Sequence, residues 1–155
     1  MIAFKNIILT TDLSQMSDAA APYAVDFAQK YDGLIHLVHV FEDLIFYPPT
    51  LTEAPLAVDV SEVLRETHAE RATKLDQHAK DLSQQYGVQV VPVLLRGHAG
   101  NEIVSYAKRE NIDLIVTATH GRGGISHLIF GSVAERVVRT SYCPVMTVRP
   151  AEHKK

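Results

Sequence analysis

Apolar residues follow two different spacings along the chain. Five short runs rich in β-branched residues are apolar at consecutive positions, which is typical of strands buried on both faces in a parallel sheet. The longer segments between them carry apolar residues every three or four positions, the period of a helix packed on one side. The strand runs span residues 4–10, 34–41, 88–95, 113–118 and 144–148, and helical segments span residues 17–32, 59–86 and 101–110 and begin again at 132. This alternation predicts an α/β fold, with helices crossing between parallel strands.

Capping residues mark the ends of two of these helices. Ser17 is placed to cap the first helix and Gly33 to follow its end, while Pro22 is expected to loosen its first turn. In the last helix, Ser132 and Glu135 have the spacing of a capping box. We therefore expect a serine cap at the start of both helices.

One connection is long and irregular. Residues 42–58 follow the second strand and contain Pro48, Pro49 and Pro55, which exclude a regular helix or strand there. We interpret this loop, from Glu42 to Val58, as a mobile flap or a partner-contact loop.

Length and composition indicate one ordinary domain. The chain has 155 residues, of which 46% are hydrophobic, so it can bury a core without disulfides or metals. Its single cysteine, Cys143, cannot form an internal disulfide and is expected to be an inert core thiol, and no signal peptide or long apolar run is present. We expect a soluble cytoplasmic protein with one domain at residues 1–150 and a short charged tail at 151–155. The net charge of −3, without a dense Lys/Arg patch, argues against nucleic-acid or membrane partners.

Candidate chemistry lies where strands end, because ligands of open parallel sheets bind beyond the carboxyl ends of the strands. Four of the eight glycines follow the fourth strand: Gly121, Gly123, Gly124 and Gly131. A glycine-rich turn lets backbone N–H groups approach a ligand, and the helix starting at Gly131 and Ser132 adds unpaired donors at the positive end of its dipole. The pattern predicts an anion cradle with phosphate as its occupant. The same glycines are equally compatible with tight turns that bind nothing.

Other catalytic and metal-binding patterns are weaker. The chain lacks the P-loop sequence, and the glycines after the fourth strand form only a broken dinucleotide fingerprint. His36 and His39 are expected on opposite faces of a strand. His68 and His78 are off-register on a helix, so no metal site is predicted. No nucleophile has a paired base and an orienting third group, so catalysis is poorly supported.

Several of these segments together resemble the universal stress protein superfamily. Gly121 is followed after nine residues by Gly131 and Ser132, then by a short amphipathic helix and the sequence CPVMTV. The amino-terminal IILTTDLS, the second-strand LIHLVHV and the RGH turn before the third helix match the same family, so the resemblance covers nearly the whole chain. It implies a single-domain open five-stranded parallel sheet of order 3-2-1-4-5 with helices on both faces, the adenine-nucleotide alpha hydrolase-like fold.

The resemblance also implies a nucleotide site. In members that bind ATP the motif is G-x2-G-x9-G-[ST], whose later positions this chain meets from Gly121 to Ser132. Ala118 occupies the first glycine position, a departure that weakens the motif and that brings strain if the position requires a positive φ. By similarity, Asp12 contacts the ribose or adenine, the backbone of Val40 reads the adenine edge, and the cradle holds the phosphates. The full candidate set is Thr11, Asp12, Val40, Ala118, His120, Gly121, Arg122, Gly124, Gly131, Ser132 and Val133.

Some of these assignments have structural alternatives. Asp12 also suits the turn that follows the first strand. His120 can shape the glycine turn as well as bond to a phosphate. Arg122, Arg136 and Arg139 can supply positive charge to the cradle or lie solvated on a surface.

For function, the resemblance implies a cytoplasmic universal stress protein that binds ATP, or AMP or ADP, together with Mg²⁺. Such a protein acts as a stress-response regulatory module toward an unidentified signalling partner. Family members are usually dimeric, and the apolar edge strand Val145–Val148 is expected to pair across a two-fold axis in a homodimer. Two alternatives stay open: a nucleotide-free dimeric interaction module whose glycines are structural, and a slow ATPase.

Overall fold

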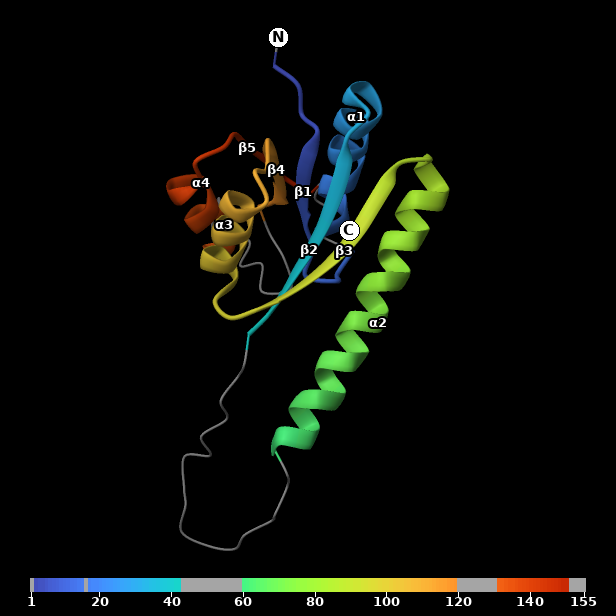
Figure 1. Ribbon diagram of the computed structural model, residues 1–155. Coiled ribbons are helices and arrows are strands. Elements are labelled where there is room, and N and C mark those ends of the chain that lie inside the picture. Colours follow the sequence, from blue (N-terminus) through green and yellow to red (C-terminus); the bar gives the residue numbers. More distant parts are fainter. Residues whose placement is uncertain (1, 16, 43–59, 120–130, 151–155) are drawn as a thin grey trace, which may run out of the picture.

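The computed structural model describes residues 2–15, 17–42, 60–119 and 131–150, and its five strands form one parallel sheet (Figure 1). The strands are β1 (Asn6–Thr10), β2 (Leu34–Phe41), β3 (Gln89–Arg96), β4 (Leu114–Ala118) and β5 (Val145–Val148). Their order, β3-β2-β1-β4-β5, confirms the predicted fold class. The predicted tail and all of the predicted loop except Glu42 lie outside the described residues.

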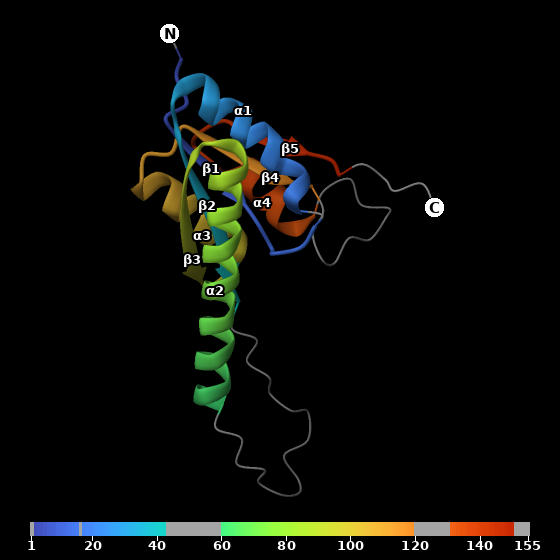
Figure 2. The same ribbon diagram turned by 90° about the vertical axis from the view of Figure 1, so that its right-hand side faces the viewer.

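Helices cover both faces of this sheet. A 3₁₀ turn, η1 (Ser17–Ala20), precedes α1 (Ala21–Tyr31), and the later helices are α2 (Val60–Tyr86), α3 (Ala99–Arg109) and α4 (Ser132–Thr140). Helices α1 and α2 lie on one face and α3 and α4 on the other, as two perpendicular views show (Figures 1 and 2). The first part of α2 projects beyond the sheet (Figure 2). Crossover helices of this kind are what parallel strands require.

The central strands β1 and β4 are mostly apolar because each one contributes side chains to two separate cores, whereas the edge strand β3 is largely exposed or half-buried. Successive side chains of a strand point to opposite faces of the sheet. In β1, Ile7 and Leu9 pack in the cluster beneath α1 and α2, whereas Ile8 packs in the cluster beneath α3 and α4. In β4, Val116 packs beneath α1 and α2, and Ile115 packs beneath α3 and α4. Both faces are therefore buried, which explains the consecutive apolar residues in the sequence.

The predicted cap of the first helix is wrong. The chain forms the 3₁₀ turn from Ser17, and α1 itself begins at Ala21 with Pro22 in its first turn. Proline suits that place because its φ is already helical and its missing N–H would have had no acceptor in the helix. The Ser17 hydroxyl instead donates to the carbonyl of Ser14 at 2.7 Å. Ser17 thus supports the turn after β1.

The predicted capping box of the last helix is also wrong. Helix α4 begins at Ser132 as expected, but Gly131 is the N-cap, and no side chain bonds to the cap. Glu135 contacts Arg139 at 3.5 Å instead. Gly131 takes the cap position because its N–H donates to the carbonyl of Thr119 at 2.6 Å. This tertiary hydrogen bond places the N-cap at Gly131, one residue before the serine.

Gly33 follows the end of α1 as predicted, although the reason differs from the expected one. The left-handed residue is Asp32, with φ 50°, whereas Gly33 is not in that region. A Cβ on Gly33 would lie 2.7 Å from the carbonyl oxygen of Phe4. Glycine is needed here because the backbones of two segments approach closely.

His36 is a buried histidine whose protonation opposes folding. It is 8% exposed, its Nδ1 lies 2.9 Å from the hydroxyl of Tyr106, and its Nε2 is the one buried side-chain nitrogen or oxygen without a partner among the described residues. Burial lowers the pKa of His36 from its usual 6.5, and the nearby Glu110 carboxylate opposes that shift. Between the lowered pKa and 6.5 the unfolded chain binds a proton that the folded chain does not.

We therefore expect the free energy of unfolding to have its full value above pH 6.5 and to fall as the pH drops below 6.5. The slope contributed by His36 is up to about 1.4 kcal/mol per pH unit within that window. Urea unfolding at about pH 7.5 and about pH 5.5 measures it, with His36→Gln as the comparison. An equal loss of stability in both proteins would show that other groups carry the pH dependence.

Candidate functional site

The strand order reverses between β1 and β4, and this is where ligands of open α/β sheets bind. From β1 the chain builds outward through β2 and β3, and then returns to add β4 and β5 on the other side. At the carboxyl ends, Thr10 Oγ1 donates to Thr117 Oγ1 at 2.7 Å, and both side chains are buried. This hydrogen bond joins β1 to β4 near the carboxyl end of the sheet, where the strand order reverses.

The turn after β1 is held by its own side chains. Leu13 N–H donates to Thr11 Oγ1 at 2.9 Å, and Thr11 N–H donates to the carbonyl of Val38 at 2.9 Å. The backbone N–H and hydroxyl of Ser14 both donate to Asp12 Oδ1, at 3.0 and 2.5 Å. Leu13 has φ 62°, a left-handed conformation that non-glycine residues rarely adopt. Asp12 therefore has the turn-forming role at this strand end, alongside any role toward a ligand.

The end of β4 is hydrogen-bonded to the start of α4. Ala118 is the last strand residue and pairs with Val148, and it is not among the described non-glycine residues with positive φ. Ala118 therefore does not carry the backbone strain that a positive φ would bring to an alanine. Thr119 N–H donates to the carbonyl of Val148 at 2.8 Å, and Thr119 accepts the hydrogen bond from Gly131. Residues on either side of 120–130 are thus held together directly.

The first turn of α4 presents backbone donors at this strand end. The first hydrogen bond inside the helix runs from Glu135 N–H to the carbonyl of Gly131 at 2.9 Å. The N–H groups of Ser132, Val133 and Ala134 precede that bond and have no acceptor within the helix. They carry the positive end of the helix dipole, which attracts anions. A Cβ on Gly131 would lie 3.0 Å from the Thr119 carbonyl oxygen, so glycine permits the close approach of α4 to β4.

The start of α3 differs, because a side chain of the protein already occupies it. Glu42 Oε1 accepts a hydrogen bond from Ala99 N–H at 2.9 Å. The preceding Gly97 has φ 133° and donates to the carbonyl of Phe41 at 3.0 Å, which fixes the turn between β3 and α3. The Glu42 carboxylate therefore takes the place of an external anion there. Among the described residues, no side chain caps the start of α4 in this way.

Two arginines of α4 bond to neighbouring residues. Arg136 Nε donates to Asn101 Oδ1 of α3 at 3.0 Å, and Arg139 contacts Glu135. A Cβ on Gly100 would lie 2.6 Å from Arg136 Cγ, so α3 and α4 pack closely at this point. The Arg136 contact orients α4 against α3, whereas Arg139 forms an exposed pair within α4, so neither contact requires a ligand.

The structure brings seven candidate residues to the carboxyl ends of the strands. They are Thr11 and Asp12 after β1, Val40 near the end of β2, Ala118 at the end of β4, and Gly131, Ser132 and Val133 at the start of α4. The other four, His120, Gly121, Arg122 and Gly124, lie outside the described residues.

Sequence reasoning missed two side chains that shape this region, His39 and Glu42. His39 lies on the α2 side of β2 and His36 on the α3 side, as their partners Arg71 and Tyr106 show, which confirms that they face opposite ways. The available signal was a polar residue inside an apolar strand, because a buried polar group needs partners. Glu42 left no such signal.

A groove of about 400 Å³ lies elsewhere, between α2 and the middle of β3. Its lining residues are Asp76, Ala79, Lys80, Ser83, Gln84, Val90 and Pro92. None of them is a candidate residue for the nucleotide. In the part of the chain that the structure describes, no cluster of three His, Cys, Asp or Glu side chains is placed to hold a metal.

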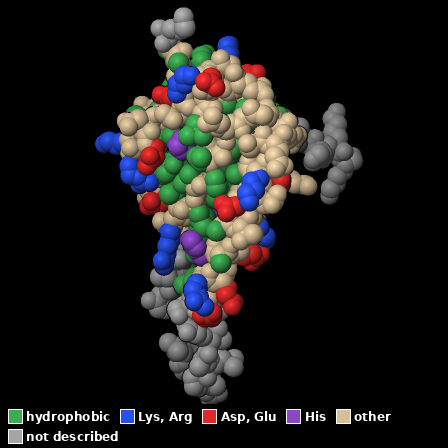
Figure 3. Space-filling view, turned by 45° about the vertical axis from the view of Figure 1, so that its right-hand side comes forward, with side chains coloured by type: hydrophobic (Ala, Val, Ile, Leu, Met, Phe, Trp, Pro, Cys, Tyr) green, Lys and Arg blue, Asp and Glu red, His purple; other side chains and the backbone are tan. Residues whose placement is uncertain are grey.

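One face of the molecule combines hydrophobic side chains with charges of both signs (Figure 3). Figure 3 shows a band of hydrophobic side chains bordered by acidic and basic side chains that are mixed together. On this face neither sign of charge dominates, so it offers no long-range attraction to a polyanion. Across the described ranges, no helix has the length and apolarity to span a membrane.

Comparison with known proteins identifies the family. The model of the universal stress protein family matches residues 3–149. A universal stress protein of Methanocaldococcus jannaschii is 33% identical over 146 residues, which cover 94% of this chain and 82% of that protein. The solved UspA of Lactobacillus plantarum superposes with a TM-score of 0.77 at 24% identity, covering 96% of this chain and all of the other. An Arabidopsis thaliana family protein solved with AMP bound has a TM-score of 0.65 at 17% identity, covering 96% and 93% of the two chains. The chain therefore belongs to the universal stress protein family.

Proposed function

We propose that this protein binds an adenine nucleotide, ATP or its forms ADP and AMP, in the crevice between the carboxyl ends of β1 and β4. The observation that carries the proposal is the start of α4, where three N–H groups without helical acceptors are held beside the end of β4 by the Gly131 to Thr119 hydrogen bond. Support also comes from the Arabidopsis thaliana relative, which was solved with AMP bound.

The residues present fit such a ligand. Ser132 and Val133 N–H groups would hold phosphate oxygens, and the close approach that Gly131 permits keeps them at the strand end. Asp12 and the backbone of Val40, on the neighbouring strand ends, would hold the adenosine. When bound with ATP, Mg²⁺ would neutralise part of the phosphate charge. Each hydrogen bond to a charged phosphate oxygen contributes about 1.5–3 kcal/mol, so the geometry of α4 controls most of the affinity.

We propose that the protein is a regulatory module of the cytoplasm and not primarily an enzyme. A signalling partner would distinguish its nucleotide-bound form from its nucleotide-free form. The single Cys143 fits a reducing compartment.

Two measurements test the nucleotide proposal. Protein purified without added nucleotide is denatured and any released nucleotide is identified by mass spectrometry. Calorimetric titration of the emptied protein with ATP, ADP and AMP, each with and without Mg²⁺, is then expected to show saturable binding, with GTP as the control ligand. No saturable binding up to millimolar adenine nucleotide would contradict the proposal and favour the nucleotide-free interaction module.

We also propose a homodimer formed through β5. Both β3 and β5 are edge strands, but β3 contains Pro92, which lacks an N–H and blunts that edge against pairing. Strand β5 contains no proline, and three of its four residues, Val145, Met146 and Thr147, are only partly buried. Light scattering at micromolar concentration is expected to give twice the 17.2 kDa mass of the chain. A monomeric mass would refute the dimer and leave the nucleotide proposal standing.

A further inference from the structure

His39 of β2 is engaged at both ring nitrogens. The side chain is 4% exposed. Its Nδ1 lies 2.8 Å from the carbonyl oxygen of Thr11, and its Nε2 lies 3.0 Å from Nη1 of Arg71 on α2. His39 therefore stands between the turn after β1 and the long helix, next in sequence to Val40.

The two partners fix where the proton of the imidazole sits. A carbonyl oxygen only accepts, so Nδ1 must carry the hydrogen that bonds to Thr11. A guanidinium only donates, so Nε2 must be the bare nitrogen that accepts from Arg71. The arrangement requires a neutral His39 with its proton on Nδ1. A protonated ring would present two N–H donors and would lose the hydrogen bond from Arg71.

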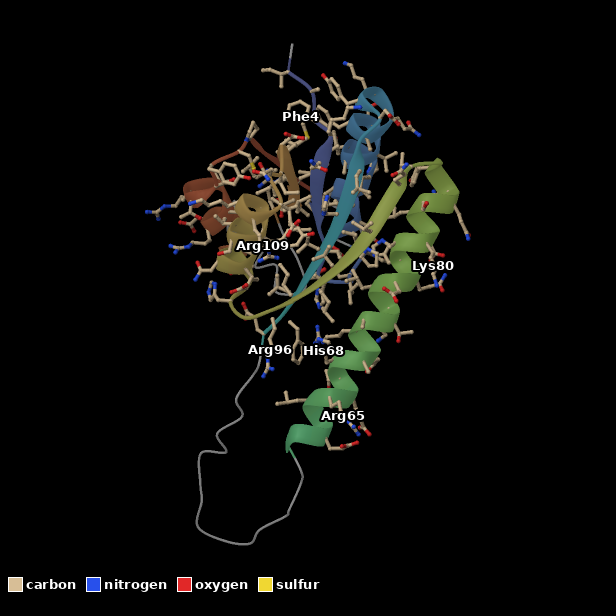
Figure 4. All side chains as sticks on the ribbon, in the orientation of Figure 1. Phe4, Arg65, His68, Lys80, Arg96 and Arg109 are labelled. Carbon is tan, nitrogen blue, oxygen red and sulfur yellow. The ribbon has the colours of Figure 1, made fainter. Side chains whose placement is uncertain are left out.

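Arg71 is itself held at the strand end. Its guanidinium carbon lies 5.2 Å from the centre of the Phe41 ring, a cation–π contact, and the His68 ring meets the same phenyl ring edge-on at 6.1 Å. Figure 4 shows His68 between α2 and Arg96 at the end of β3. Beyond this cluster α2 continues toward its start, in the part that projects past the sheet. Arg71 thus provides a polar link between α2, near its projecting part, and the sheet edge that carries the site.

We infer that His39 is a positioning residue for the nucleotide site and that the chain Arg71–His39–Thr11 couples the projecting half of α2 to the occupancy of that site. The inference rests on the proposed nucleotide site. The carbonyl of Thr11 belongs to the peptide that leads into Asp12, so the hydrogen bond from His39 sets the orientation of the turn that meets the adenosine. Coupling of this kind is reciprocal: a nucleotide that orders the turn orders α2, and a partner bound to α2 changes nucleotide affinity.

The test removes the Arg71 donor while keeping the packing on Phe41. Arg71→Met retains an unbranched side chain of similar reach, and Arg65→Met, six residues earlier on α2, is the matched control. Arg65 is exposed and pairs with Glu62 of the same helix at 2.5 Å, so its loss is expected to matter little. We expect Arg71→Met to weaken ATP binding by about ten-fold and Arg65→Met to leave it unchanged. In the wild type, ATP is expected to slow amide exchange around Arg71, and Arg71→Met is expected to lose that protection.

A second pair of variants addresses His39 itself. His39→Leu removes both hydrogen bonds, whereas His39→Asn offers a donor near the position of Nδ1. We expect His39→Asn to recover part of the affinity that His39→Leu loses. Wild-type affinity and unchanged α2 protection in Arg71→Met would overturn the inference, even if His39→Leu failed to fold.

Failure of the inference and failure of the proposed function give different results. If the wild-type protein binds no adenine nucleotide, the proposed function fails. The Arg71–His39–Thr11 chain is still tested in the nucleotide-free protein, by the nitrogen chemical shifts of His39 and the amide exchange of Leu13 and Ser14. We expect the Nδ1–H tautomer in the wild type and faster exchange of those two amides in Arg71→Met. An Nε2–H tautomer in the wild type, or exchange rates unchanged by Arg71→Met, would refute the chain of contacts on its own.

Discussion

Replacement of Gly131 by valine is expected to abolish saturable adenine-nucleotide binding while the sheet stays folded. The first added atom, Cβ, would lie 3.0 Å from the carbonyl oxygen of Thr119. That carbonyl has little room to yield, because Thr119 N–H is already bonded to Val148 of β5. The start of α4 must move instead, and the N–H groups of its first turn move with it. Loss of their common geometry is expected to weaken ATP binding by at least about 100-fold.

Calorimetric titration with ATP measures this effect, and circular dichroism checks the fold. Gly131→Ala is expected to give an intermediate loss of about ten-fold, since it adds Cβ without the two methyl groups. Val138→Ala, on the exposed side of the same helix, is the control and is expected to bind as the wild type does. Tight binding by Gly131→Val would mean that the start of α4 is not where the phosphates lie.

Replacement of Gly33 by alanine is expected to lower the free energy of unfolding by about 2 kcal/mol, or the melting temperature by about 4–8 °C. Its Cβ would meet two backbone oxygens, Phe4 O at 2.7 Å and Lys5 O at 3.2 Å, and neither is the end of a flexible side chain. The chain enters β2 at this point, at the amino end of the sheet. The affinity of the folded protein for nucleotide is therefore expected to be unchanged.

The control for Gly33 is Gly87, the residue that follows α2. Gly87 has φ 65°, but a Cβ there would have no neighbour within 4 Å. Asparagine tolerates the left-handed region, so Gly87→Asn is expected to lose less than half of what Gly33→Ala loses. Thermal unfolding of the three proteins measures the difference. Equal stability of Gly33→Ala and the wild type would show that the segments before β1 and β2 separate without penalty.

The positions of the strands could be predicted from the sequence because the apolar run that forms a strand is a local feature of the chain. Strand β2 occupies Leu34–Phe41, the predicted range, since a run of apolar residues buried on both faces has sharp limits. The order of the strands came from the resemblance to the family rather than from periodicity. Helix caps were predicted wrongly at Ser17, where a local turn to Ser14 precedes the helix, and at Ser132, where the hydrogen bond from Gly131 to Thr119 of another element fixes the cap.

For the candidate site, too, some residues could be predicted from the sequence and others could not. The glycine before α4 and the polar residues after β1 were visible as motifs, and the structure places them at one edge of the sheet. The partners that hold them were not visible. Arg71 is 32 positions from His39, and Glu42 is 57 positions from the N–H it caps, so both depend on where α2 and α3 pack. Ala118 needed the structure as well, since only its place in β4 shows that it has no positive φ.

The hydrogen bond between Thr10 and Thr117 spans 107 positions of the chain. Strands β1, β2 and β3 can assemble with α1 and α2 from neighbouring segments, but the strand ends of the proposed site come together only after β4 has docked against β1. Contacts of such long range form slowly, because their loop must close before they contribute. A nucleotide bound there would recognise only the finished fold, and would hold the two halves together by mass action. The free energy of unfolding would then rise with the logarithm of the free nucleotide concentration, so the lifetime of the protein would follow the supply of its own ligand.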